Sequence, residues 1–120
     1  MANPNIVSVA SIYGKVAGLA VTTSATAIVS NASSSGKIYK VNSLIVSNVD
    51  GAANADVTVT VYKNQSTSFH IASTVTVPAD ATLVVISKDT SIYLEENDSI
   101  RLTANVNSDL EAVCSWDEIA

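Results

Sequence analysis

The chain has 120 residues, of which 48% are hydrophobic, only 5% are aromatic and only 14% are charged. The formal net charge of −5 argues against nucleic-acid binding, which needs a basic face to neutralise phosphates, and against docking on anionic membranes. This length favours a single domain, residues 1–120, whose core is large enough to fold without disulfides or metals. The scarcity of charge also favours contacts with other chains.

The first 36 residues predict either strands or an arm that reaches a neighbouring chain. Residues 6–13 have the composition of a strand, which Gly14 is expected to end. Residues 15–23 fit a strand or an extended arm, and residues 25–29 predict a second short strand. The run from Asn31 to Gly36 predicts a flexible turn.

Residues 37–48 form the longest continuous strand pattern, and their apolar positions change parity partway. Tyr39 and Val41 have odd numbers, whereas Leu44 and Val46 have even numbers. Since side chains alternate between the two faces of a strand, this change predicts either a central strand buried on both faces or a bulge.

The remaining segments predict a series of short strands. Residues 56–62 alternate with period two, and residues 69–77 end before Pro78, which cannot donate to a strand ladder. Residues 82–86 and 91–94 follow, and residues 100–106 and 110–116 are expected to pair as a hairpin. About eight short strands predict an all-β fold, an antiparallel two-sheet sandwich of Greek-key or jelly-roll type.

The residues that carry chemistry are few and scattered. Cys114 is the single cysteine and His70 the single histidine, too few for a protein zinc site. Cys114 shares a predicted face with Leu110 and Trp116, which favours a buried thiol over a nucleophile. His70 is expected to be a polar side chain on the solvent side of a strand or at an interface.

The acidic residues allow two interpretations. Glu95, Glu96 and Asp98 are either calcium ligands or, as we favour, a solvated turn. Glu111 and Glu118 would serve glycoside hydrolysis only if they faced each other across a cleft. The sequence therefore assigns no catalytic, cofactor-binding or metal-binding residue, and predicts that the protein is not an enzyme.

The aromatic residues are also ambiguous. Tyr13, Tyr39, Tyr62 and Tyr93 are either interface anchors or caps at the rim of the core. Trp116 is expected to close the core near the C-terminus.

Residues 93–104, YLEENDSIRLTA, and residues 109–119, DLEAVCSWDEI, resemble small β-sandwich virion proteins of tailed bacteriophages, especially those of aquatic phages. Residues 40–48, KVNSLIVSN, are similar to them as well, as is Pro78 before an apolar strand. The likeness covers roughly residues 37–119 and includes no catalytic motif, whereas residues 1–36 have no clear counterpart.

The resemblance implies a virion component made in the host cytoplasm, without cofactors or active-site residues. A capsid decoration or cement protein is the first expectation. Such a protein is expected to form a homo-oligomer and to bind other virion proteins, the major capsid protein among them. A neck, tail or baseplate component is the alternative within this class. A carbohydrate- or receptor-binding module is the alternative from another class, since jelly-roll sandwiches often hold sugars.

Overall fold

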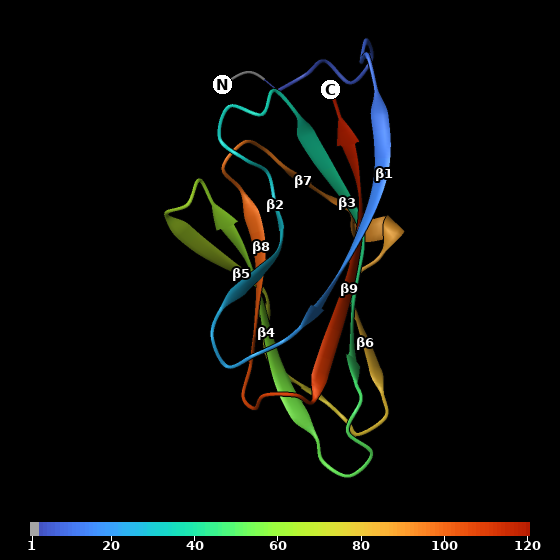
Figure 1. Cartoon of the computed structure of the whole chain (residues 1–120), viewed down its shortest axis with the longest axis vertical. Helices are drawn as coiled ribbons and strands as arrows, with labels where there is room; N and C mark the ends of the chain where they lie inside the picture. Colours follow the sequence, from blue (N-terminus) through green and yellow to red (C-terminus); the bar gives the residue numbers. More distant parts are fainter. Residues whose placement is uncertain (1–2) are drawn as a thin grey trace.

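The computed structural model describes residues 3–120, which form two antiparallel sheets packed face to face (Figure 1). Sheet A has the strand order β1-β9-β3-β6, with β7 also paired to β3, and sheet B has the order β2-β8-β4-β5. The strands are β1 (Ile12–Ala20), β2 (Thr26–Ser30), β3 (Ile38–Asn48), β4 (Ala55–Lys63), β5 (Thr67–Val77), β6 (Thr82–Ile86), β7 (Ile92–Leu94), β8 (Ser99–Ala104) and β9 (Leu110–Ile119). The prediction of an all-β, two-sheet antiparallel sandwich is confirmed. Between β6 and β7 lies a short 3₁₀ turn, η1 (Lys88–Thr90).

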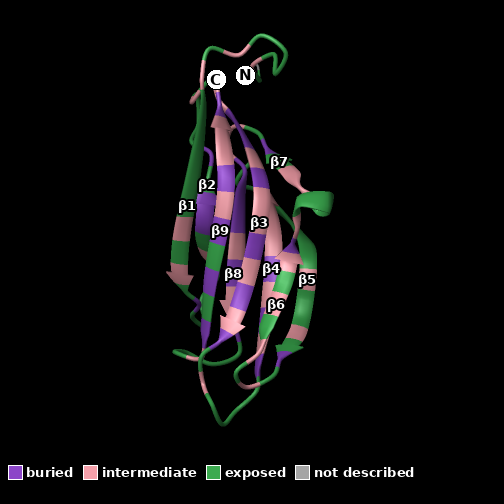
Figure 2. Cartoon of the chain, turned by 90° about the vertical axis from the view of Figure 1, so that its right-hand side faces the viewer, coloured by how far each residue is buried: buried purple, intermediate pink, exposed green. Residues whose placement is uncertain are grey.

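The core lies between the sheets and is built mostly from branched aliphatic side chains. In β4, Val57 and Val59 are fully buried, while Thr58 and Thr60 between them are partly exposed, as the period-two pattern predicts. The buried positions of sheet A come mainly from β3 and β9 (Figure 2). Fully buried residues include Val41, Leu44, Val46, Leu102, Leu110 and Cys114.

A bulge in β3 explains the change of parity that the sequence shows. The register of β3 against β9 shifts between Val41 and Ser43, so that Asn42 is the extra residue. Val41 on one side and Leu44 on the other are both fully buried. The extra residue shifts the alternation of β3 by one position, so the apolar side chains on both sides of the bulge point into the core.

The first strand lies further along the chain than the sequence predicts. Residues 6–11 form no strand, and β1 runs through Gly14 to Ala20. Gly14 does not end the strand because it pairs with Asp117 in an unbroken register with β9. Residues 15–20, where strand and arm were both open, are thus part of sheet A.

The predicted hairpin between the last two strands is wrong. β8 pairs with β2 and β4 in sheet B, whereas β9 pairs with β1 and β3 in sheet A. The alternating patterns of β8 and β9 are both real, but their apolar sides face each other across the core. Alternation identifies the buried face of a strand and carries no information about its neighbour in the sheet.

Replacing Val59 by Asp is expected to abolish folding, because it places a carboxylate at a fully buried position at a cost of several kcal/mol. A domain of this size is stabilised by only about 5–15 kcal/mol. Thermal unfolding followed by circular dichroism measures the effect. The matched control is Val84→Asp on β6, where the side chain is 59% exposed. An unchanged Tm for Val59→Asp would show that the assignment of the core face is wrong.

Candidate functional site

Cys114 and His70 lie in different sheets. Cys114 is on the inner face of β9 in sheet A and is fully buried, whereas His70 is on β5 of sheet B and is exposed. Burial raises the pKa of the Cys114 thiol to about 12, so this group is protonated at neutral pH. The prediction of a buried, apolar thiol is confirmed, and the two residues form no nucleophile pair.

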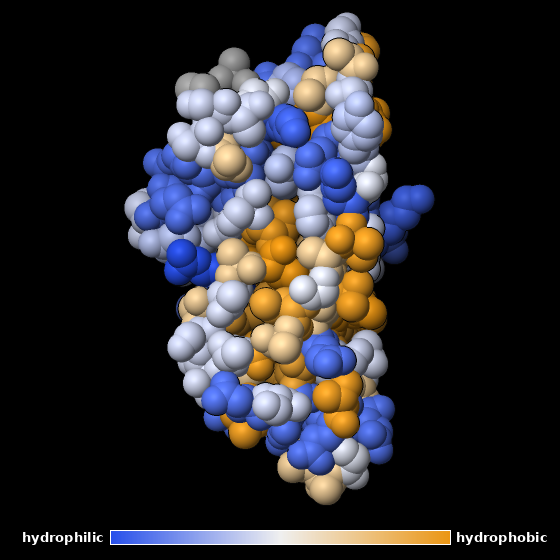
Figure 3. Space-filling view, in the orientation of Figure 1, coloured by the Kyte–Doolittle hydropathy of each residue, from blue (hydrophilic) through white to orange (hydrophobic). Residues whose placement is uncertain are grey.

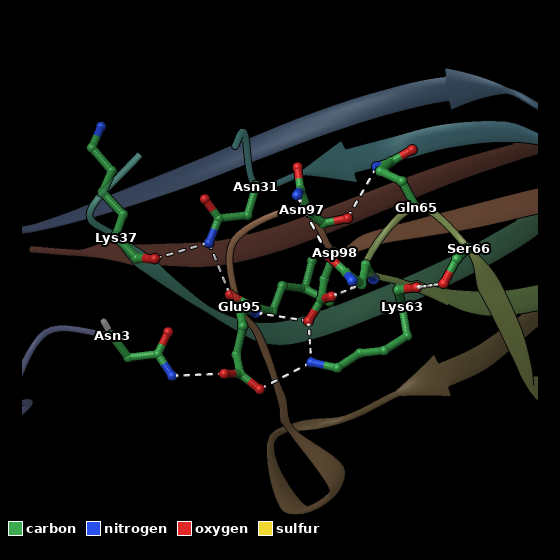
Figure 4. A network of polar contacts seen from close by, with 11 residues as sticks. Asn3, Asn31, Lys37, Lys63, Gln65, Ser66, Glu95, Asn97 and Asp98 are labelled. Carbon is green, nitrogen blue, oxygen red and sulfur yellow. Dashed lines mark hydrogen bonds and ion pairs between the residues drawn. The ribbon is translucent and has the colours of Figure 1, made fainter. Parts of the chain in front are cut away.

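The sequence favoured a solvated turn for Asp98, but in the structure Asp98 is the centre of a polar network. Its side chain is 2% exposed. Its Oδ2 accepts hydrogen bonds from Lys63 Nζ at 2.8 Å and from the Glu95 backbone N–H at 3.0 Å, and its Oδ1 accepts from the Asn64 N–H at 2.9 Å (Figure 4). The carboxylate thus joins the loop after β7 to the turn between β4 and β5.

The network continues from Lys63 to the N-terminal segment. Lys63 Nζ also lies 2.9 Å from Glu95 Oε1, and Glu95 Oε2 accepts a hydrogen bond from Asn3 Nδ2 at 2.9 Å (Figure 4). The pKa of Lys63 is raised, first by its hydrogen bond to Asp98 and then by that to Glu95. The pKa of Glu95 is lowered, first by Lys63 and then by Asn3.

These contacts surround a hollow of about 360 Å³ between the N-terminal segment and the turns. Within residues 3–120, no group of three His, Cys, Asp or Glu side chains is arranged to hold a metal ion. Two of the three acids at this place are paired with Lys63, and Glu96 Oε2 accepts the Gly36 N–H at 2.7 Å. The arrangement is suited to fastening chain segments together.

Two buried asparagines fix further loops, and the sequence reasoning missed both. Asn31 Nδ2 donates to the carbonyls of Lys37 and Leu94, at 2.9 and 3.0 Å. Asn48 Nδ2 donates to the carbonyls of Ala53 and Val77, both at 2.9 Å. Each asparagine lies at a strand end before a loop rich in small residues, and this position was the available signal.

The remaining acidic candidates do not meet. Glu111 is exposed on the outer face of β9, whereas Glu118 accepts hydrogen bonds from Lys37 Nζ and from the Nε1 of Trp116 on the inner face. The two carboxylates therefore lie on opposite faces of the same strand. They cannot act on one substrate from two sides.

The aromatic side chains divide into inward and outward positions. Tyr39 and Trp116 stack with ring centroids 6.2 Å apart and are each 9% exposed, so the expectation that Trp116 closes the core is confirmed. Burial raises the pKa of Tyr39, and the neighbouring Glu118 carboxylate raises it further. Tyr62 packs under the Arg101 guanidinium at 3.8 Å. Tyr13 and Tyr93 are exposed and remain available as interface anchors.

Four paired residues form a line across the outer face of sheet A, which we call the apolar row: Gly18, Val113, Ile45 and Val84. Gly18 of β1 pairs with Val113 of β9, Val113 with Ile45 of β3, and Ile45 with Val84 of β6. Val113 is 43% exposed and Val84 59% exposed. Ile45 and Val84 also border a hollow of about 680 Å³ on this face.

Further apolar surface lies at the β1 side of the sandwich. Val16, one step along β1 from the apolar row on the same face, is 69% exposed. Figure 3 shows apolar side chains gathered along the middle of this side of the molecule. Sequence reasoning missed this surface, because a valine in an alternating strand is expected to point inward.

No family model matches the chain, and no curated protein matches it. Its fold is similar to a structure solved for Bacillus endospore appendages, which form disulfide-linked pili, with a TM-score of 0.55 and 14% identity over 92% of this chain and 87% of that one. Two structures of a pentameric capsid protein from metagenomic phage sequences match with TM-scores of 0.43 and 0.42 and 17% identity. The chain covers 62% and 59% of their lengths. At these identities the likeness to the appendage structure shows a shared fold.

Within residues 3–120, no helix is long and apolar enough to span a membrane.

Cys114 is expected to resist alkylation by iodoacetamide at pH 8 in the native protein, because its thiol is both buried and protonated. In urea it should react at the rate of a free thiol. Mass spectrometry of the labelled chain measures both. Complete labelling of the native protein within minutes would contradict the burial of this residue.

Lys63→Gln is expected to lower the Tm within a defined pH window. The lowered pKa of Glu95 means that its stabilising contribution is complete above 4.5, its ordinary value, and is lost as the pH falls through the lower folded value. The raised pKa of Lys63 means that its contribution is complete below 10.5 and is lost as the pH rises through the higher folded value.

The Tm difference between Lys63→Gln and the wild type should therefore be largest between these limits and should shrink outside them. Thermal melts over a pH series measure it. Lys88→Gln, at an exposed lysine of η1, is the control and should leave the melting curve unchanged at every pH. An equal loss of Tm at all pH values would assign the effect of Lys63 to packing.

Proposed function

We propose that the protein is a non-enzymatic structural component of a bacteriophage virion, and that it decorates and cements the capsid shell. In this role it binds the major capsid protein and further copies of itself. The observation that carries the proposal is the apolar row, in which Val113 is 43% exposed and Val84 59% exposed on the outer face of sheet A.

A sheet with apolar side chains on both faces is suited to a contact on its second face. The inner face of sheet A packs against sheet B, and the outer face presents the apolar row without a covering layer among residues 3–120. Transfer of apolar surface from water contributes about 25 cal/mol per Å², and the entropic cost of association reduces the net gain. The binding energies of many modest contacts add up over a shell. Once one contact holds a copy on the particle, its further contacts form at a high effective concentration.

Three observations support a role in a virion. Residues 93–104 and 109–119 resemble small virion proteins of tailed phages. We interpret the orders β1-β9-β3-β6 and β2-β8-β4-β5 as a jelly roll, with β6 and β7 as one interrupted strand, and jelly rolls are frequent in viral capsids. The similar fold of the endospore appendages belongs to an assembly of many subunits, which is support by analogy of fold.

The alternatives differ in how many copies a particle holds. A neck, tail or baseplate component would have few copies, whereas a decoration protein would match the major capsid protein in a simple ratio. A carbohydrate- or receptor-binding module is favoured by the exposed Tyr13 and Tyr93, since sugars stack on aromatic rings. The most extensive aromatic surface, Trp116 with Tyr39, is however turned into the core.

Quantitative mass spectrometry of purified particles tests the proposal by counting this chain against the major capsid protein. We expect a near-equal or simple-fraction ratio. A few copies per particle would assign the chain to the neck or tail, and its absence would overturn the virion role. Val113→Lys should reduce incorporation, whereas the matched control Val106→Lys, in the loop after β8, should be incorporated normally.

A further inference from the structure

The outer strands, β1, β6 and the three-residue β7 of sheet A and β2 and β5 of sheet B, differ in how well their free edges are protected. Proteins usually protect a free edge with a short strand, a bulge or charges, because unpaired backbone groups bind other strands. β2 and β6 have only five residues each. β5 is long, but its register against β4 shifts twice, and Thr74 has a φ of 49° in the left-handed region.

β1 has the weakest protection of these edges, because it is neither short nor interrupted by a bulge and carries a single charge. Its nine residues pair one for one with β9 without a register shift, so the backbone on its free side is equally regular. Lys15 is its single charged residue, and it contains no proline. Ile12, Tyr13 and Val16 are 58%, 61% and 69% exposed. Figure 2 shows β1 as the outermost strand on its side, with β2 behind it and further in, so β2 does not cover the free edge.

We propose that this edge binds the same edge of a second copy, so that β1 pairs antiparallel with β1 of its partner. The inference rests on the proposed structural role and names one contact that such a role would use. One register, with Val16 facing Val16 of the other copy, pairs all nine residues. Its other pairs are Ile12 with Ala20, Tyr13 with Leu19, Gly14 with Gly18, and Lys15 with Ala17.

The side chains in this register are compatible in size. Large residues face small or aliphatic ones, and glycine faces glycine two residues to either side of the central valines. Lys15 faces an alanine, so no two like charges lie directly opposite each other, which would destabilise the pair. The Lys15 residues of the two copies are diagonal neighbours, and as exposed, flexible side chains they can extend away from each other into solvent.

The pairing has clear geometric consequences. Nine pairs extend over about 30 Å, at about 3.4 Å per residue, and main-chain hydrogen bonds supply much of the contact. The contact is isologous, so it closes at two copies. It joins two copies of sheet A into one continuous sheet, with both apolar rows on the same outer face. That face stays free for another partner, as the proposed function requires.

A cysteine at position 16 tests the register directly. Opposite residues of an antiparallel pair have Cα atoms about 4.5–5.5 Å apart, which suits a disulfide. Val16→Cys is therefore expected to form a disulfide-linked dimer under mild oxidation, while the buried Cys114 does not compete. The control is Val106→Cys, an exposed valine in the loop after β8 and outside both proposed contact surfaces. A Val16→Cys chain that stays monomeric on a non-reducing gel, or links no faster than Val106→Cys, would overturn the proposal.

A charge exchange provides a second test in solution. Analytical ultracentrifugation should show a concentration-dependent dimer for the wild type, and about tenfold weaker association for Val16→Lys and for Val16→Glu alone. A mixture of the two variants should dimerise again, because position 16 meets itself in this register alone. Val106→Lys, in the loop after β8, should associate like the wild type. Unchanged association of Val16→Lys, or a mixture that stays monomeric, would contradict the proposal.

The two proposals fail in different experiments. If the chain is present in particles but Val16→Cys does not cross-link, the virion role stands and the β1 contact is wrong. If the dimer forms and the chain is absent from particles, the edge contact stands and the virion role is wrong.

Discussion

The whole structure depends on closing two sheets over a core that has almost no aromatic side chains. Val, Leu and Ile each contribute about 1.5–3 kcal/mol when fully buried, but only if the sheets approach to about 10 Å and the side chains interlock. The bulge at Asn42 serves this closure, because it keeps both halves of β3 in phase with the core. The stacked pair Tyr39 and Trp116 supplies the one large aromatic contact there.

Polar groups hold the connections that a core of this kind cannot order by itself. Asp98, Asn31 and Asn48 are buried, and each satisfies backbone or side-chain partners from segments distant in the sequence. An unsatisfied group at such a position would cost about 1–3 kcal/mol. The asparagines hold the loops after β2 and β3, and Asp98 is satisfied by Lys63 and by two backbone N–H groups.

Local pattern predicts the strands well and their partners poorly. The alternation in residues 56–62 and the parity change in residues 37–48 report directly which side chains are buried, and the structure agrees with both. The pairing of β8 with β9 failed because two adjacent amphipathic strands can pair side by side or face each other, and their sequences are the same in both cases. The apolar row could not be predicted either, since Val113 and Val84 become neighbours only through pairings between distant strands.

The pairing of β1 with β9 joins the first strand of the fold to the last. Most other connections cross from one sheet to the other, so few contacts form between neighbours in the sequence. Topologies of this kind fold slowly, because a long loop must close before its ends are stabilised. During synthesis β1 has no sheet to join until residues 110–119 have left the ribosome. A regular free edge therefore arises only after β9 has been made, and fragments that end before residue 110 lack the surface on which copies would associate.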